Sequence, residues 1–142
     1  MKTLKINTLD KCWCDRDDLL LHASFQILVD FVEKEEPGKI IDWNCNKEYK
    51  RIWKEITSLY KWWKKIRPAR KSPLDDKRLK YPPFEFKNIK NKNYTQLVFP
   101  NKKKYAKFYK VMKKDKKLEQ RWDKEDNQNL HRLINIRKDL WT

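Results

Sequence analysis

Apolar side chains recur at helical spacing in the first third of the chain. Two stripes of them fall three or four positions apart between about residues 15 and 36: Leu21, Phe25, Leu28 and Val32, and Leu20, Ile27 and Phe31. Asp15 is suited to begin the helix, because its side chain can accept hydrogen bonds from the first amide groups, and Pro37 and Gly38 end it. Two adjacent stripes give a wide apolar face, which predicts the central and most buried helix of the fold.

A second amphipathic helix is predicted from about Asn46 to Ile66. Its apolar face follows helical spacing through Tyr49, Ile52, Trp53, Ile56, Leu59, Tyr60 and Trp63. The other face is basic and carries Lys47, Lys50, Arg51, Lys54, Lys61, Lys64 and Lys65. Arg67 ends the helix, because the residue before a proline is disfavoured in the helical conformation. We expect one side of this helix to pack on the first helix and the other to form a cationic strip.

An irregular connection is predicted over about residues 67–101. It holds five prolines between Pro68 and Pro100, and no long hydrophobic period runs through it. Only the segment from Tyr94 to Phe99 has the composition of a strand. A connection of this length is uncommon in a compact domain, so it is either functional or partly disordered.

Helical spacing returns after Asn101. Tyr105, Phe108, Tyr109 and Met112 form one face, and the surrounding lysines are Lys103, Lys104, Lys107, Lys110, Lys113, Lys114, Lys116 and Lys117. A last helix, capped by Asp126 or Asn127, is expected to hold Leu130, Leu133, Ile134, Arg137 and Trp141 on one side. One continuous helix is geometrically allowed, but charged residues occupy the stripe between the two apolar faces. We therefore predict a break or bend near Asp123.

These elements predict an all-α fold, a small four-helix bundle or orthogonal helical array with a long irregular, proline-rich connection. The chain has 142 residues, so we expect a single helical domain over residues 1–142. Leu, Ile, Val and Phe make up 34 of these residues, which is enough for a charged chain to fold. The only glycine is Gly38, which excludes P-loops and dinucleotide-binding turns because they need several glycines.

Positive charge is concentrated in the middle of the chain. The chain has 36 Lys and Arg against 20 Asp and Glu, a net charge of +16. Residues 47–117 carry 25 of the basic and 6 of the acidic side chains, a net charge of +19, whereas residues 1–46 carry −3 and residues 118–142 carry zero. The excess therefore lies on the second helix, the connection and the helix after Asn101.

No arrangement of residues predicts catalysis or a metal site. Cys12, Cys14, Cys45 and His22 lack the paired spacing of structural zinc ligands. Asp42 and the Glu48-Tyr49-Lys50 step are similar to the acidic and lysine residues of metal-dependent nucleases, but on a helix the two side chains diverge. Asp15, Asp17 and Asp18 fit helix capping better than cation binding. We expect no enzymatic activity, no metal and no cofactor.

The expected location is the cytoplasm, without membrane association. No stretch approaches the roughly 20 apolar residues of a membrane span, and residues 1–10 lack the apolar block of a secretory signal. The three cysteines cannot pair completely, which favours reduced thiols.

Four separated blocks carry a resemblance to a known group of proteins. They are DRDDLLLHASFQILVDFVEKE at residues 15–35, IDW at 41–43, LYKWWKKIRPAR at 59–70 and EDNQNLHRLINIRKDLWT at 125–142. Together they resemble small proteins of unassigned activity encoded in tailed-bacteriophage genomes. The resemblance implies a phage origin and action in the cytoplasm of the bacterial host, and it implies no activity.

The concentrated positive charge predicts binding to a polyanion, DNA, RNA or a ribonucleoprotein. Lysines outnumber arginines 28 to 8, which favours phosphate contacts over base readout. Trp62 is predicted to lie at the edge of its helix, where it could stack on a base, or alternatively to pack beneath the connection from Pro68 to Pro83. The candidate residues are Lys50, Arg51, Lys54, Lys61, Trp62, Lys64, Lys65, Arg67, Arg70, Lys103, Lys104, Lys107, Lys110, Lys113, Lys114 and Lys117.

Other interpretations remain open at the level of sequence. The chain could be an inhibitor or modifier that binds an acidic host protein or defence protein. Codon usage in an AT-rich genome could also produce a solvated lysine surface with no partner. A small-molecule pocket near Trp43, Trp53 and Trp63 has the same sequence pattern as a filled core, and the oligomeric state is equally open.

Overall fold

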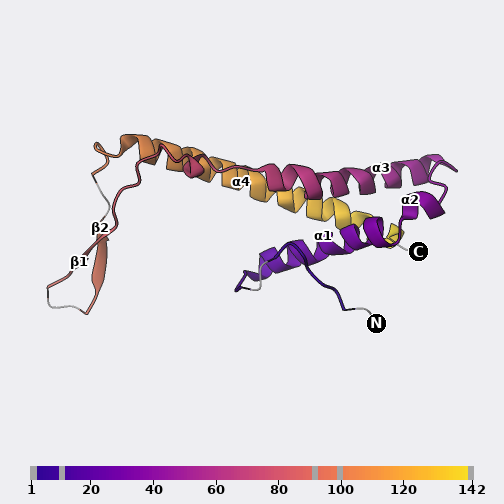
Figure 1. Cartoon of the computed structure of the whole chain (residues 1–142), viewed down its shortest axis with the longest axis horizontal. Coiled ribbons are helices and arrows are strands. Elements are labelled where there is room, and N and C mark those ends of the chain that lie inside the picture. The colour runs from indigo at the N-terminus through magenta and orange to yellow at the C-terminus, as the bar shows by residue number, and fades with distance from the viewer. Residues whose placement is uncertain (1–2, 10–11, 91–92, 99–100, 141–142) are drawn as a thin grey trace. The chain divides into compact units, whose positions relative to one another are not determined.

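The predicted all-α fold class is confirmed. The computed structural model describes residues 3–9, 12–90, 93–98 and 101–140. It is mostly helical, with 62% helix and 6% strand, and these residues form four α-helices, one of them long and bent, and a two-stranded hairpin (Figure 1). Phe99 and Trp141, which the sequence assigned to a strand and to the last helix, lie outside the described residues. No helix in the described ranges is long and apolar enough to cross a membrane.

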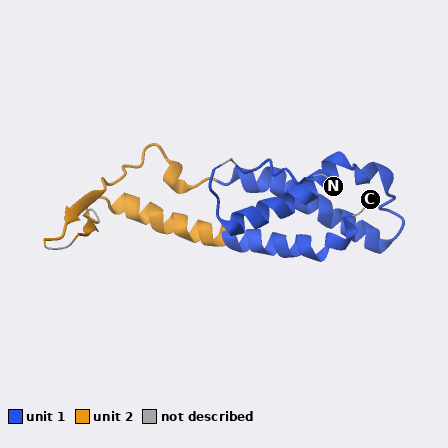
Figure 2. Ribbon diagram, turned by 90° about the horizontal axis from the view of Figure 1, so that it is seen from below, with its two compact units in different colours: residues 1–70, 123–142 blue, residues 71–122 orange. Residues whose placement is uncertain are grey.

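The chain divides into two compact units, each described below by itself (Figure 2). Unit 1 comprises residues 1–70 and 123–142, and unit 2 comprises residues 71–122. The last helix, α4 (Ala106–Asn135), contributes its first part to unit 2 and its last part to unit 1. The expectation of one domain over the whole chain stays a prediction.

Helix α1 (Arg16–Lys34) confirms the first predicted helix, and with seven buried residues it is well buried, as predicted. Phe25, Leu28 and Phe31 are at most 2% exposed and belong to the core of unit 1. Leu20 and Ile27, in contrast, are 60% and 51% exposed. Of the two predicted stripes, the second is buried only at Phe31, because α1 packs on α3 (Lys47–Lys61) and leaves Leu20 and Ile27 uncovered.

Helix α3 confirms the second predicted helix. The Asn46 side chain accepts a hydrogen bond from the Tyr49 amide at 2.8 Å and thereby caps the first turn. Ile52, Ile56 and Leu59 are buried as their spacing predicted. The helix continues through a π-helical turn (Trp62–Ile66) and a 3₁₀ turn (Arg67–Ala69), and the backbone becomes extended only at Arg70. The prediction that Arg67 ends the helix is wrong, because Arg67 keeps helical backbone angles (φ −59°, ψ −47°) despite the following proline.

Between α1 and α3 the chain forms a short helix, α2 (Pro37–Ile40), which the sequence did not predict. Glu36 before it adopts a left-handed backbone with φ 48°, which turns the chain away from α1. Trp43 follows α2, and its Nε1 donates a hydrogen bond to the Pro37 carbonyl at 3.0 Å.

Unit 2 holds most of the predicted irregular connection, from residue 71 onward, and this part contains more structure than expected. Strands β1 (Glu85–Asn88) and β2 (Thr95–Val98) form an antiparallel hairpin in which Phe86 pairs with Leu97. The strand predicted from Tyr94 to Phe99 is confirmed at Thr95–Val98, while Tyr94 precedes it. Its partner β1 was missed, because the adjacent prolines 82 and 83 weighed against a strand although Phe84-Glu85-Phe86-Lys87 alternates apolar and charged residues.

The two helices predicted after Asn101 form one continuous helix, α4. The helix is not broken, but it is bent as predicted. That the bend lies near Asp123 stays a prediction. Neither glycine nor proline occurs between Ala106 and Asn135, so nothing interrupts the backbone hydrogen bonding. Asp126 and Asn127 therefore lie inside the helix and cap nothing, and Asp126 makes ion pairs instead.

Candidate nucleic-acid interface

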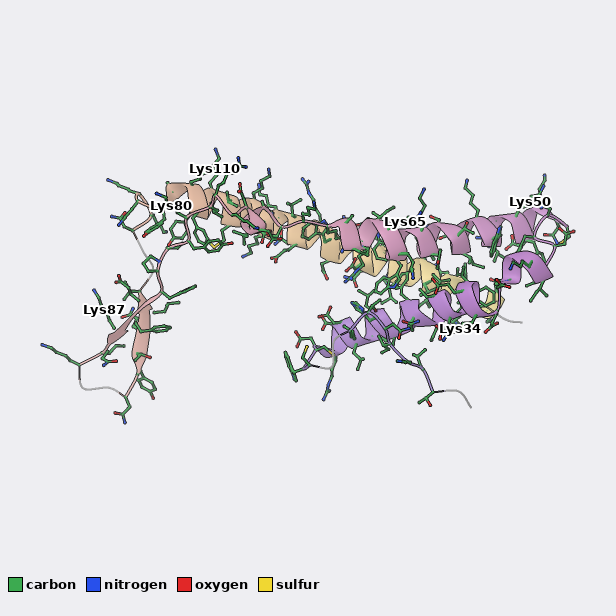
Figure 3. All side chains as sticks on the ribbon, in the orientation of Figure 1. Lys34, Lys50, Lys65, Lys80, Lys87 and Lys110 are labelled. Carbon is green, nitrogen blue, oxygen red and sulfur yellow. The ribbon has the colours of Figure 1, made fainter. Side chains whose placement is uncertain are left out.

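Four predicted lysines form an exposed strip on α3 and its extension in unit 1. Lys50, Lys54, Lys61 and Lys65 are exposed, and none of them pairs with a carboxylate in the described residues. Figure 3 shows Lys50 near the start of α3 and Lys65 beyond its end. This part of the predicted cationic face is present.

The other predicted cations of unit 1 are paired within the chain. Arg51 contacts Glu48 at 2.6 Å and Lys64 contacts Glu33 at 2.9 Å, both at exposed positions where pairing is weak. Hydrogen bonds from Tyr60 and then Lys64 hold the pKa of Glu33 below its usual value.

Arg67 and Arg70 are internal structural cations, which corrects their assignment to a nucleic-acid surface. Arg67 reaches Asp126 at 3.1 Å, and Arg70 reaches Glu125 at 2.6 Å and Asp126 at 2.7 Å. The side chain of Arg70 is only 14% exposed. Guanidinium groups held this way are committed to carboxylates of α4 and are not presented to a phosphate.

Trp62 is likewise part of the core, so the stacking role predicted for it is wrong. It is 4% exposed, its ring lies 5.2 Å from that of Phe25, and its Nε1 donates a hydrogen bond to Glu125 Oε1 at 3.0 Å. The π-helical turn explains the error. Its wider turn separates successive side chains by a smaller angle than an α-helix does, so Trp62 and Trp63 both face inward.

Trp43, Trp53 and Trp63, which the sequence left open as the lining of a small-molecule pocket, each stack on another aromatic ring. Trp63 stacks on Phe25 at 4.5 Å, and Trp43 stacks on Trp53 at 5.0 Å. A groove of about 410 Å³ lies beside Trp43 and Tyr49 in unit 1.

Most of the net charge lies in unit 2. Its 52 residues include 17 Lys and Arg and 5 Asp and Glu, a net charge of +12. Two of the five carboxylates are engaged internally: Asp115 is 5% exposed and accepts a hydrogen bond from Ser72 Oγ at 2.6 Å, and Asp76 pairs with Arg78 at 3.1 Å. The surface of unit 2 is therefore dominated by cations.

The first part of α4 carries a lysine face. Lys107, Lys110, Lys114, Lys117 and Arg121 follow one another three or four residues apart, so they share one side of the helix over about 21 Å. All five are exposed, and no described carboxylate pairs with any of them. Phe108 and Asp115 fall on the opposite side of the helix. We call this set of five residues the lysine face.

A cationic groove adjoins this helix within unit 2. It has a volume of about 390 Å³ and is lined by Arg78, Leu79, Lys80, Lys104, Tyr105, Lys107 and Phe108. Lys104 also lies 5.7 Å from the Tyr105 ring centroid. Figure 3 labels Lys80, which comes from the connection, and Lys110 on α4. Arg78 and Lys80 were missed by the sequence analysis, because they lie in a segment without a hydrophobic period.

An apolar pocket of about 120 Å³ lies next to the cationic groove, and Phe108 lines both. The pocket is formed by Tyr81, Pro82, Phe84, Leu97, Val98, Phe108, Tyr109 and Met112. The rings of Tyr81 and Phe108 are 5.3 Å apart. Several aromatic side chains of this region are exposed: Tyr81 at 56%, Phe84 at 79%, Phe86 at 67% and Tyr94 at 69%.

These exposed aromatic residues were also missed, although the sequence held a signal for them. Phe84 and Phe86 alternate with Glu85 and Lys87, and clusters of lysine surround them on both sides in sequence. Aromatic residues interleaved with cations are typical of surfaces that bind nucleic acid.

No protein-family model, curated protein or solved structure matches the chain. The resemblance to bacteriophage proteins therefore stays a prediction. Among the described residues, no three His, Cys, Asp or Glu side chains come together as ligands for a metal ion.

Proposed function

We propose that this chain is a basic, non-catalytic accessory protein that binds nucleic acid, alone or in a ribonucleoprotein, mainly through phosphate contacts made by unit 2. The lysine face supports this most directly, because its five cations are exposed and unpaired within the described residues. The setting implied by the resemblance to bacteriophage proteins is the cytoplasm of a bacterial host.

The physical basis is the release of counterions. Lysines that approach phosphates displace condensed cations from the nucleic acid, and the entropy gained drives binding at low salt. Lysine is a compact point charge, whereas arginine makes the bidentate contacts that distinguish guanine. Four of the five cations of the lysine face are lysines, so we expect little preference for base sequence.

A gel-shift titration of the full chain against DNA and RNA tests the proposal. The apparent affinity should fall by orders of magnitude between about 50 and 200 mM salt, because each phosphate contact adds roughly 0.7 to 0.9 to the slope of log affinity against log salt concentration. The absence of any complex at the low end of this range would contradict the proposal.

Two charge variants show which unit makes the contacts. Replacing Lys107, Lys110, Lys114 and Lys117 with Gln should weaken binding and lower the salt slope by up to about 3. The matched control replaces Lys50, Lys54, Lys61 and Lys65 with Gln, which removes the same charge from positions of unit 1 that are also exposed. If the control weakens binding as much or more, the phosphate contacts are made by unit 1 and not by the lysine face.

A second function, binding to a host or defence protein, is favoured by the uncovered side of α1. Leu20 and Ile27 are seven residues apart, lie on one side of the helix and are 60% and 51% exposed. Apolar residues gathered on a helix face are typical of protein-binding surfaces. A pull-down from nuclease-treated bacterial lysate should recover a stoichiometric partner with the native chain and lose it when both residues are replaced with Glu. Failure to recover any partner would remove this function.

A further inference from the structure

We infer that the nucleic acid bound by unit 2 is single-stranded, with phosphates at the cationic groove and bases stacked on the aromatic side chains of the hairpin and the apolar pocket. This inference rests on the proposed function and names its substrate class. DNA and RNA share the chemistry involved, which is a chain of phosphates that carries exposed base faces.

The adjacency of the groove and the pocket supports this inference. Phe108 lines both, with Lys104 and Lys107 on the groove side and Tyr81 and Phe84 on the pocket side. A ligand that spans them must carry negative charge next to a flat apolar group. A nucleotide within a flexible strand meets this requirement.

The size of the pocket favours a base on a strand over a separate small molecule as its occupant. Its volume of about 120 Å³ is well below the roughly 300 Å³ at the lower end of pockets that enclose whole small molecules. The pocket can accept one ring, while the phosphate and sugar attached to it remain outside. This fits a base on a strand better than an independently bound metabolite.

The exposed rings of the hairpin distinguish a single strand from a duplex. Phe84 directly precedes β1 and Phe86 lies within it, so alternation along the strand places these two rings on one face. Tyr94 directly precedes β2, and the pairing of Asn88 with Thr95 places it on the opposite face. In a duplex the faces of the bases are covered by stacking, whereas an unpaired strand exposes them to aromatic side chains. Rings that are more than two thirds exposed gain burial by stacking on unpaired bases.

The charge around the rings favours a polyanion over an apolar protein surface as the occupant. Lys80, Lys104 and Lys107 border the site, and Lys87 lies on β1 (Figure 3). A docked apolar protein surface would take water from these ammonium groups without offering partners, which is costly. A phosphate chain offers a partner at regular intervals.

The test measures fluorescence anisotropy of labelled oligonucleotides of about 12 nucleotides, within the range of known single-strand site sizes, as single-stranded DNA, single-stranded RNA and DNA duplex. The variant F84L/F86L keeps apolar side chains but removes both rings. It should bind either single strand about ten-fold more weakly or worse, with an unchanged salt slope and unchanged affinity for duplex. Trp13→Leu is the matched control, since Trp13 is an 84% exposed aromatic residue of unit 1. It should leave binding unchanged.

The outcomes separate the two proposals. If the full chain binds neither single strand nor duplex at low salt, the proposed function fails and the inference fails with it. If binding is present and depends on the lysine face, but F84L/F86L matches the native chain, the inference alone fails and the rings serve another occupant, such as a protein or a second copy of this chain. Tighter binding to duplex than to a single strand also overturns the inference.

Discussion

Trp62 Nε1 donates a hydrogen bond to Glu125 Oε1 at 3.0 Å, and this contact joins the π-helical turn to the last part of α4 within unit 1. Around it, Arg67 and Arg70 pair with Asp126, and the Arg70 guanidinium carbon lies 5.6 Å from the centroid of the Trp62 ring. Trp62, Arg67 and Arg70, which the sequence predicted to bind a ligand, therefore hold the end of the second helix against the last part of α4.

Replacing Asp126 with Asn tests how much this network stabilises unit 1. The change leaves two cations, at 23% and 14% side-chain exposure, without their shared carboxylate. We expect a loss of about 2–3 kcal/mol in the free energy of unfolding, below the full range for a completely buried pair because some solvent reaches these groups. Denaturant unfolding followed by circular dichroism measures it.

The control for this prediction is Asp123→Asn, which removes an exposed carboxylate from the same helix. It should change the free energy of unfolding by less than about 0.5 kcal/mol. Equal effects of the two substitutions would show that the ion pairs at Asp126 add nothing beyond general charge.

The sequence predicted unit 1 well where the local pattern is strong. The apolar spacing of α3 is nearly complete, and its buried residues Ile52, Ile56 and Leu59 lie where helical periodicity put them. The partners of Arg67 and Arg70 could not be predicted in this way. Their carboxylates lie 55 to 59 residues further along the chain, and local periodicity carries no information about such long-range pairing.

The candidate site in unit 2 was predicted only in part for a related reason. The lysines of α4 were found because they lie on a helix with a clear apolar face. Arg78, Lys80, Phe84 and Phe86 belong to the connection, where position in space depends on how the chain packs against α4 and on the hairpin register. Proline content identified the segment as irregular but gave no fold for it.

The buried imidazole of His22 should make stability depend on pH. Burial, and then the positive charge of Arg67, lower the pKa of His22 below 6.5, against the smaller opposing effects of Asp18 and Asp126. Between the folded pKa and pH 6.5, His22 is therefore protonated in the unfolded state but neutral in the folded state. Stability should be greatest above pH 6.5 and decrease as the pH falls from 6.5 toward the folded pKa.

Two measurements check this pH dependence. Titration of the His22 ring by NMR should give a midpoint below 6.5. In denaturant unfolding, His22→Gln should flatten the slope of stability against pH just below 6.5, while the slope at lower pH, where carboxylates titrate, is unchanged. A His22 midpoint above 6.5 would reverse the sign of the effect and refute the assignment.

Gly38 is the only glycine in the chain, and the ring of Trp53 explains its presence. A Cβ at this position would lie 3.0 Å from Trp53 Cζ2 and 3.2 Å from Cη2. Replacing a helical glycine with alanine normally stabilises by about 0.5–1 kcal/mol, whereas overpacking a core costs about 1–3 kcal/mol. Since Trp53 is stacked on Trp43 and cannot move freely, we expect Gly38→Ala to destabilise by about 1 kcal/mol.

The near-ultraviolet circular dichroism of the tryptophans reports the predicted shift of the Trp53 ring. Gly38→Ala should change this signal and lower the melting temperature together. A more stable variant with an unchanged aromatic signal would show that the Cβ fits beside Trp53 without displacing its ring, and would contradict the prediction.

A hydrogen bond between Ser72 and Asp115 stabilises unit 2. Ser72 Oγ donates to Asp115 Oδ1 at 2.6 Å and accepts from the Leu74 amide at 3.0 Å, so one hydroxyl caps a 3₁₀ turn (Pro73–Asp75) and satisfies a carboxylate that is 5% exposed. Ser72→Ala removes this donor from a carboxylate that is only 5% exposed. We expect unit 2 to lose about 2 kcal/mol of stability, because a buried acceptor without a partner bears its full desolvation cost.

A double-mutant cycle separates this cost from the worth of the hydrogen bond. When Asp115→Leu is added to Ser72→Ala, both polar partners disappear, so the double variant should be more stable than Ser72→Ala alone. Hydrogen exchange of amides in residues 71–122 measures the local stability of unit 2 in the full chain. If the two substitutions are additive, the hydroxyl and the carboxylate do not interact, and Asp115 is held in the fold by something other than Ser72.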